Sequence, residues 1–202
     1  IDDVALLHEH IERTGLAVLV TAGDEGPLIS HLPLLLDRGA GGQGVLIGHL
    51  ARANPQLRHS RLDQTAVAIF QGPDAYVSPG WYASKREHGR VVPTWNYAVV
   101  HARGRLSLFE EPERLRSAVD RLTARHEAHS AQPWTTADAP AGFIAAQLKG
   151  IVGIELVITS LEGKYKLSQN RPEGDRAAVL NGFDHSNDPA ARQLASEMKK
   201  KA

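Results

Sequence analysis

The 202-residue chain contains no cysteine, a single methionine and few aromatic residues, which make up 5% of the sequence. Without cysteine there is no disulfide framework and no thiol chemistry, a composition typical of a protein of the reducing cytoplasm. No apolar run reaches the roughly 18 residues that a membrane-spanning helix needs, so we expect no membrane partner. Because the sequence begins at Ile1 rather than at methionine, we expect the natural chain to start earlier.

The chain also lacks an excess of charge of either sign. It has 23 lysines and arginines against 23 aspartates and glutamates, and its net charge is therefore zero. A domain dedicated to nucleic acid usually carries a basic surplus. Contact with DNA through a local basic patch stays open, but the overall charge does not support it. The hydrophobic share of 42% is that of a folded globular protein.

Apolar and β-branched runs separated by turn residues predict strands with hairpin spacing in the first half of the chain. The last predicted strand is apolar on both faces and should lie in the middle of its sheet. Pro33 falls inside the second strand and predicts a sheet edge or a bulge. The predicted strands cover residues 16–21, 28–36, 45–50, 65–70, 94–109 and 151–161.

Amphipathic spacing predicts helices around these strands, and residues 72–93 are predicted to form a long loop. The predicted helices cover residues 4–14, 54–61, 113–127 and 143–148, with two more after Asp175 and Asp188. Strands followed by helices, without regular alternation, indicate a mainly β fold with peripheral helices (α+β), built as a small antiparallel barrel. We expect one domain over residues 1–202 with a C-terminal helical extension.

Residues 164–172, Lys-Tyr-Lys-Leu-Ser-Gln-Asn-Arg-Pro, carry unusually many hydrogen-bond donors directly after a strong strand pattern. Lysine offers a point charge, arginine a planar fork, and glutamine and asparagine offer amide donors and acceptors. A solvated turn does not need so varied a set, whereas an anionic ligand does. The pattern predicts an anion site, although one of the two lysines could be an ordinary surface charge.

Three further polar clusters accompany this segment. His31 lies on the second predicted strand, residues 48–55 end the third strand and begin a helix, and aromatic residues gather at 81–85 and 92–97. Backbone N–H groups at a helix start favour phosphate, and flat rings with polar tips suit a planar heterocycle. Each cluster also has a plainer interpretation: a satisfied core histidine, a helix cap at Asn54, and rings that pack over a barrel mouth.

Other chemistries fit the sequence less well. His8 and His10 are two residues apart on a predicted helix and point to different faces, and His126 and His129 lack a convincing set of further ligands. There is no Gly-x-Ser-x-Gly motif and no cysteine nucleophile. We therefore predict neither a metal site nor a catalytic residue.

The clusters resemble, in the same order along nearly the whole chain, the motifs of the PaiB family of FMN-binding negative transcriptional regulators. The motifs are Gly-His-Leu-Ala-Arg-Ala-Asn-Pro-Gln at 48–56, Tyr-Val-Ser-Pro-Gly-Trp-Tyr at 76–82, Val-Val-Pro-Thr-Trp-Asn-Tyr at 91–97, Lys-Gly-Ile-Val-Gly at 149–153 and Lys-Leu-Ser-Gln-Asn-Arg at 166–171. The family is related to the flavin-binding split β-barrels, which include the pyridoxamine-phosphate oxidases. The resemblance implies an antiparallel split β-barrel that forms a homodimer with two FMN sites at the subunit interface.

By the same resemblance, the FMN phosphate would lie against the segment from His49 to Asn54, with His31 on the neighbouring strand. Thr94 and Asn96 would hold the ring edge, and the cations and amides near the end of the chain would reach across the dimer interface. The residues that the resemblance assigns to FMN are His31, His49, Leu50, Ala51, Arg52, Asn54, Lys85, Thr94, Trp95, Asn96, Lys166, Gln169 and Arg171.

Three functions remain open at this point. The first is a cytoplasmic, dimeric FMN-binding regulator of transcription. The second is a flavin-dependent oxidoreductase acting on a small molecule, with His31, His49 and Tyr82 as candidate proton donors. The third is a repressor that binds protein or DNA without flavin, which the neutral charge disfavours.

Overall fold

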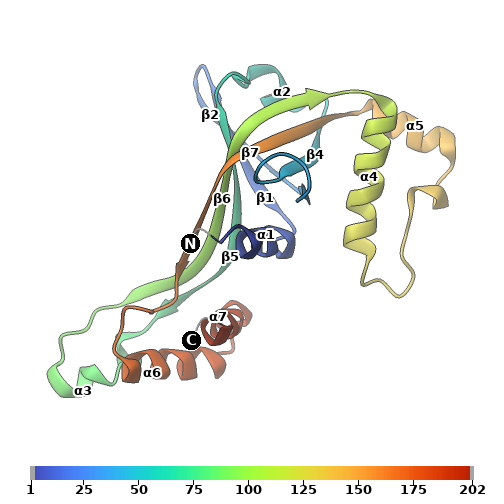
Figure 1. The fold of residues 1–202 in the computed structure, drawn as a ribbon. Coiled ribbons are helices and arrows are strands. Elements are labelled where there is room, and N and C mark those ends of the chain that lie inside the picture. The colour runs from blue at the N-terminus through green and yellow to red at the C-terminus, as the bar shows by residue number, and fades with distance from the viewer. Residues whose placement is uncertain (1–2, 201–202) are drawn as a thin grey trace. The chain divides into compact units, whose positions relative to one another are not determined.

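The computed structural model describes residues 3–200 and contains one seven-stranded sheet and several helices (Figure 1). The strands are β1 (Ala17–Gly23), β2 (Gly26–Leu32), β3 (Leu35–Asp37), β4 (Val45–Ala51), β5 (Thr65–Val77), β6 (Thr94–Phe109) and β7 (Ile151–Lys166). The helices are α1 (Val4–Arg13), α2 (Gln56–His59), α3 (Ser84–His88), α4 (Pro112–Glu127), α5 (Ala141–Lys149), α6 (Glu173–Asp184) and α7 (Pro189–Lys200). Two short 3₁₀ turns cover Pro79–Trp81 and Thr136–Asp138.

The strands follow the order β2-β1-β5-β6-β7-β4-β3, and β1–β2, β1–β5, β3–β4 and β4–β7 pair in antiparallel register. The predicted α+β class with an antiparallel sheet is confirmed. The last strand, β7, lies between β6 and β4, so its predicted central place is also confirmed.

The described residues divide into two compact units. We call residues 3–70 and 101–162 the sheet unit, and residues 71–100 and 163–200 the helical unit. β5, β6 and β7 each contribute residues to both units. The assignment of the whole chain to one domain stays a prediction.

Within the sheet unit, β2 and β4 contact each other although they lie far apart in the strand order. Gly48 on β4 makes this approach possible, because an added Cβ would lie 2.7 Å from the Leu34 side chain and 2.9 Å from the Pro33 carbonyl. β2 and β3 stand at the two ends of the strand order and are joined by only two residues, so the sheet curves back on itself. The enclosed core contains Leu19, Leu46, Phe70, Ile154 and Leu156, each at most 1% exposed.

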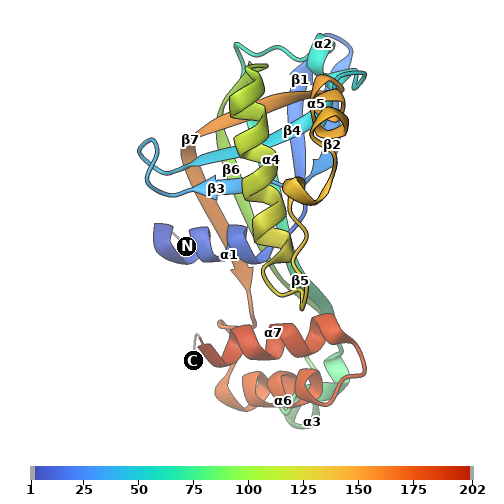
Figure 2. The same ribbon diagram turned by 90° about the vertical axis from the view of Figure 1, so that its right-hand side faces the viewer.

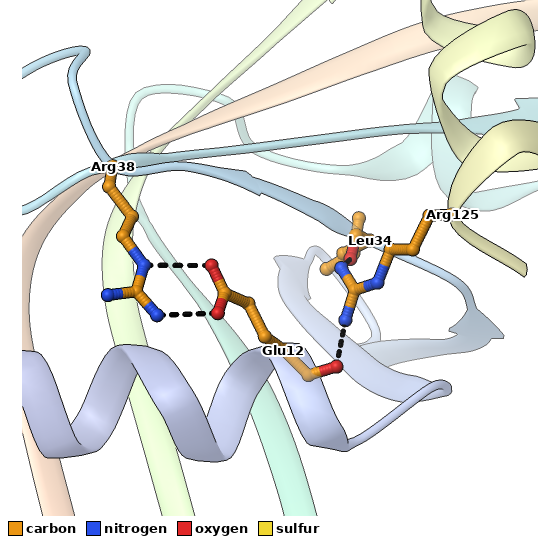
Figure 3. A network of polar contacts seen from close by, with 4 residues as sticks. All are labelled: Glu12, Leu34, Arg38 and Arg125. Carbon is orange, nitrogen blue, oxygen red and sulfur yellow. Dashed lines mark hydrogen bonds and ion pairs between the residues drawn. The ribbon is translucent and has the colours of Figure 1, made fainter. Parts of the chain in front are cut away.

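An arginine on α4 joins the segment between β2 and β3 to the end of α1 (Figure 3). Arg125 on α4 donates hydrogen bonds to the Leu34 carbonyl at 3.2 Å and to the Glu12 carbonyl on α1. Glu12 in turn accepts both bonds of a bidentate ion pair from Arg38, and the hydrogen bond from this guanidinium lowers the pKa of the Glu12 carboxyl. Both side chains of that pair are largely exposed, so the backbone bonds of Arg125 matter more for order than the ion pair does.

The helical unit contains α6 and α7 side by side (Figure 2), with the 3₁₀ turn at Pro79–Trp81 packed on α6. The Trp81 ring meets Phe183 edge-on at 5.5 Å between centroids, and it lies over Gly182, where a Cβ would clash with the ring. Val179, Phe183 and Leu194 form the buried side of the helix pair.

The structure corrects three predicted boundaries. The single strand predicted for residues 28–36 is wrong, because Pro33 and Leu34 separate β2 from β3. The loop predicted for 72–93 is also largely wrong, since β5 continues to Val77 and is followed by a 3₁₀ turn and α3. β7 extends five residues past the predicted end at Leu161 and includes Lys166. Strand pairing in the sheet overrides the local preference of Gly72 and Pro73 for a loop.

The contact at Gly48 yields a test of the fold. Gly48→Ala should lower the free energy of unfolding by about 1–3 kcal/mol, because the methyl group forces β4 away from Pro33 and Leu34. Gly42→Ala is the matched control, since nothing lies within 4 Å of an added Cβ there, and its effect should stay within about 0.5 kcal/mol. Chemical denaturation measures both, and equal stabilities of the two variants would contradict the proposed role of Gly48.

Candidate functional site

A groove of about 470 Å³ opens in the sheet unit where β2 meets β4. We call it the seam groove, and the side chains that matter in it are Ser30, His31, His49, Leu50, Ala51 and Asn54. All but Ser30 were predicted from the sequence as flavin-binding residues. The curvature of the sheet brings them together from two strands that are not neighbours in the sheet order.

His49 is the least satisfied polar residue of the seam groove. Its Nδ1 atom is buried and has no hydrogen-bond partner within residues 3–200. Burial lowers the pKa of the His49 imidazole below its ordinary value of 6.5, so the ring is neutral at neutral pH. A neutral imidazole with an unpaired nitrogen can accept or donate one hydrogen bond to a ligand. His31 is exposed on β2, which removes its interpretation as a core histidine.

Asn54 makes two side-chain hydrogen bonds within the protein. Its Nδ2 donates to the Ser30 hydroxyl at 2.9 Å, and its Oδ1 accepts from the Gln56 amide at 2.9 Å at the start of α2. The N-cap of α2 is Pro55, without a side-chain cap bond, so Asn54 stabilises the turn that leads into the helix and does not itself occupy the cap position. α2 spans only four residues, so its dipole offers little to an anion.

Arg52 is also committed within the sheet unit. Its guanidinium donates to the Lys149 carbonyl at 2.9 Å, the Ile151 carbonyl at 3.1 Å and the Glu110 carboxylate at 2.7 Å. Arg52 does not line the seam groove, and the groove has no lysine or arginine among its lining residues. The seam groove thus offers neutral polar groups and aliphatic surface rather than positive charge.

A second pocket, of about 600 Å³, lies in the helical unit. We call it the cationic pocket, and it brings together Thr94 and Asn96 on β6 with residues 163–171 at the end of β7 and beyond. Five further residues predicted to bind flavin meet here: Thr94, Asn96, Lys166, Gln169 and Arg171. The segment at the end of β7 that is rich in hydrogen-bond donors therefore forms one wall of the cationic pocket.

Hydrogen bonds hold the wall of the cationic pocket in place. Asn96 and the Ser168 hydroxyl bond each other at 3.0 and 3.1 Å, and the Gln169 amide bridges the Leu167 N–H and the Tyr165 carbonyl. Ser168 has φ of 60°, a left-handed conformation that costs about 1 kcal/mol outside glycine. Gln169 therefore shapes the turn, and its amide is largely spent on the backbone.

Arg171 lies over the ring of Tyr82, 4.6 Å from the guanidinium carbon to the ring centroid. Below it, Asp175 is 2% exposed and accepts hydrogen bonds from the Ser84 amide at 2.9 Å and the Ser84 hydroxyl at 2.7 Å. Burial raises the pKa of the Asp175 carboxyl, but the hydrogen bonds from Ser84 and the charge of Arg171 outweigh it, and the net pKa is lowered. Sequence reasoning missed Asp175, because a lone acidic residue near a helix start usually only caps the helix.

Besides Arg52, two more of the predicted residues line neither pocket. Lys85 is exposed on α3, and Trp95 is 52% exposed on β6, where its ring meets Tyr76 edge-on at 6.1 Å. Tyr82, a candidate proton donor, is 2% exposed, and its buried hydroxyl has no partner within the described residues. No group of three or more potential metal ligands occurs in residues 3–200, and no helix in that range is long and apolar enough to cross a membrane.

Similarity to known proteins extends over most of the chain. Residues 1–160 match the model of a family described as "Putative FMN-binding domain". The chain is 33% identical over 191 residues to the protease synthase and sporulation protein PAI 2 of Bacillus subtilis, with 95% of this chain and 89% of that protein covered. It is 32% identical to an uncharacterized protein of Emericella nidulans, AN0679, over 96% of this chain and 91% of that one.

A solved structure shares the fold at low sequence identity. The FAD and heme binding protein of Mycobacterium smegmatis superposes with a TM-score of 0.56 at 14% identity, covering 94% of each chain. At this identity the likeness concerns the fold alone. The sheet that curves until β2 contacts β4 without pairing to it is a split β-barrel, so the predicted fold is confirmed.

The burial of His49 gives a prediction on pH. Because its pKa is lowered in the folded protein, the neutral ring contributes stability above about pH 6.5, and this stability is lost as the pH falls below that value. We expect the His49 ring protons to titrate by NMR with a midpoint below 6.5, assigned by their absence in His49→Gln. The variant should also lose less stability than the native chain on acidification. A His49 midpoint at or above 6.5 would contradict the burial argument.

Proposed function

Because the chain belongs to this family of FMN-binding domains, and FMN is therefore its cofactor, we propose that it acts as a homodimeric, PaiB-like flavoprotein in which the seam groove holds part of the flavin at the subunit interface. The PaiB resemblance is itself confirmed by the match to PAI 2 over nearly the full length of both chains. The observation that carries the placement of flavin is the unpartnered, buried Nδ1 of His49 in a groove built from residues within the matched region.

The residues of the seam groove fit the neutral part of FMN better than its phosphate. Ser30, His31 and His49 offer hydroxyl and imidazole groups of the kind that the ribityl chain and the ring edge can bond, and Leu50 and Ala51 offer apolar contact. A buried nitrogen without a partner costs about 1–3 kcal/mol, and a ligand that bonds His49 Nδ1 removes that cost. Bound FMN supplies a redox centre able to take up and release hydride or single electrons.

We propose negative regulation of transcription as the role of this flavoprotein. Support comes from the relative PAI 2, whose name refers to protease synthesis and sporulation, two processes that cells control through gene expression. The zero net charge argues that the chain exerts this control through a flavin-dependent state or a protein partner, rather than through a strongly basic DNA-binding face. The cysteine-free composition suits a cytoplasmic setting.

A flavin-dependent oxidoreductase is the second candidate, and one observation favours it. A neutral imidazole beside a flavin could pass a proton to or from a substrate, and burial keeps His49 in that neutral form. Tyr82 contributes less to this alternative, because its ring is buried under Arg171. Reduction of the reconstituted protein by NADH or NADPH, followed in a stopped-flow spectrometer, tests for oxidoreductase activity. Turnover with a small-molecule oxidant would favour the enzyme, whereas a flavin that is not reduced would exclude it.

The first prediction on function concerns flavin affinity. The purified protein should take up FMN, seen as quenching of flavin fluorescence, and His49→Leu should raise the dissociation constant by about 10-fold through the loss of one hydrogen bond. His59→Leu, which changes an exposed histidine on α2, is the control and should leave the constant unchanged. A native protein that binds no FMN would refute the proposal, and equal affinities of His49→Leu and the control would move the flavin away from the seam groove.

The second prediction concerns assembly. Sedimentation equilibrium should give a dimer, and FMN should lower the dimer dissociation constant because a ligand at an interface binds only the assembled form. A stable monomer that binds FMN with full affinity would separate flavin binding from dimerisation and remove the interface from the proposal.

A further inference from the structure

The cationic pocket of the helical unit gathers three cations, and of these Arg171 has the carboxylate of Asp175 close enough for their charges to interact. Lys164, Lys166 and Arg171 line it, and no aspartate or glutamate does. Elsewhere in the described chain, cations commonly lie within ion-pair distance of a carboxylate, as in Arg103–Glu162 and Lys199–Asp184. Lys164, Lys166 and Arg171 form no ion pair with any residue in 3–200.

Most side-chain N–H groups of these cations also have no acceptor within residues 3–200. Lys166 Nζ donates to the Thr94 hydroxyl, which is neutral and leaves two ammonium N–H groups free. The Arg171 guanidinium rests on the Tyr82 ring and makes no side-chain hydrogen bond within the described residues, although its backbone N–H bonds the Ser168 carbonyl at 3.0 Å. The nearby Asp175 carboxylate is occupied by Ser84. The guanidinium group of Arg171 and the ammonium group of Lys166 therefore have N–H groups that no acceptor in residues 3–200 occupies.

The polar wall around the cations is fixed before any ligand arrives. The Asn96–Ser168 pair, the bridging amide of Gln169 and the left-handed backbone of Ser168 hold the turn that carries Arg171. A strained residue persists only where its surroundings over-determine it, and such residues cluster at binding sites. Preorganisation of this kind lowers the entropic cost of binding a ligand.

We propose that the cationic pocket binds a phosphate monoester. A phosphate monoester carries close to two negative charges at neutral pH and three acceptor oxygens, which match two ammonium groups and one bidentate guanidinium. The volume of about 600 Å³ is larger than a phosphate needs and leaves room for the organic part of the ester. FMN is one such ester, and for FMN the inference rests on the proposed function; another phosphorylated metabolite would satisfy the same chemistry independently of flavin.

The experiment compares FMN with riboflavin, which has the same ring and ribityl chain without the phosphate, and uses inorganic phosphate as a third probe. Lys166→Met in the full chain should weaken phosphate-dependent binding by about 10- to 100-fold, because it removes a charge-assisted hydrogen bond. Lys199→Met, which removes one positive charge from the same unit outside the pocket, is the matched control and should change nothing. Lys166→Arg, which keeps the charge, should restore part of the affinity.

Two results support the inference and distinguish the sources of phosphate. If Lys166→Met lowers the affinity for FMN and leaves that for riboflavin unchanged, the pocket holds the phosphate of FMN. If flavin affinities are unchanged but phosphorus NMR shows that inorganic phosphate no longer binds the variant, the pocket serves a separate phosphorylated ligand. The second result also stands if the native chain binds no flavin, in which case the proposed function fails and this inference survives.

Any other result overturns the inference. Equal losses for FMN and riboflavin would assign Lys166 to the ring or to the fold, and unchanged binding of all three probes would leave the pocket without a phosphate. Thermal unfolding followed by circular dichroism shows whether Lys166→Met is folded. If it is not, the exposed variant Lys164→Met is judged by the same criteria.

Discussion

The close approach of β4 to the segment at Pro33 and Leu34 is the contact on which the sheet unit depends. It requires a residue without a side chain at Gly48, and it is secured from the other side by the hydrogen bond from Arg125 to the Leu34 carbonyl. β2 and β3 are the two ends of the strand order, and because only Pro33 and Leu34 join them, this segment brings the two edges of the sheet together. Because β2 and β4 meet here without pairing, the barrel stays split, and the opening is the groove that contains His31 and His49.

The two pockets differ in charge, and the difference follows from how each is built. Arg52, which directly follows β4, donates hydrogen bonds to the Lys149 and Ile151 carbonyls and does not line the seam groove. No lysine or arginine is among the residues that line this groove. The cationic pocket lies at the end of β7 and in the turn after it, where no carboxylate of residues 3–200 forms an ion pair with Lys166 or Arg171, although the charge of Arg171 acts on Asp175. The family match ends at residue 160, so it includes the whole seam groove but not the segment that supplies the cations.

Much of the fold follows from local patterns in the sequence, and the misses have a physical cause. β6 and α4 were predictable because their apolar periodicity is regular over sixteen residues each. The break at Pro33 could not be placed from the sequence, because a proline inside a strand is compatible with an edge, a bulge or an end. Residues 72–77 appear loop-like because glycine and proline dominate local preference, while the pairing that extends β5 is a long-range property.

The same distinction applies to the candidate sites. Residue types alone indicated the chemistry of Lys166 and Arg171, since cations and amides so dense in sequence have few other uses. Sequence could not show that Arg52 bonds the Lys149 carbonyl or that Asn54 bonds the Ser30 hydroxyl, because the partners of a side chain are set by tertiary contacts. Of the buried side-chain atoms without a partner in residues 3–200, His49 Nδ1 belongs to a residue that lines the seam groove, whereas the oxygens of Gln43, Gln56 and Tyr82 belong to residues that line neither pocket. Burying a polar group without a partner opposes folding, which is why we propose that a ligand completes the hydrogen bonds of the His49 ring.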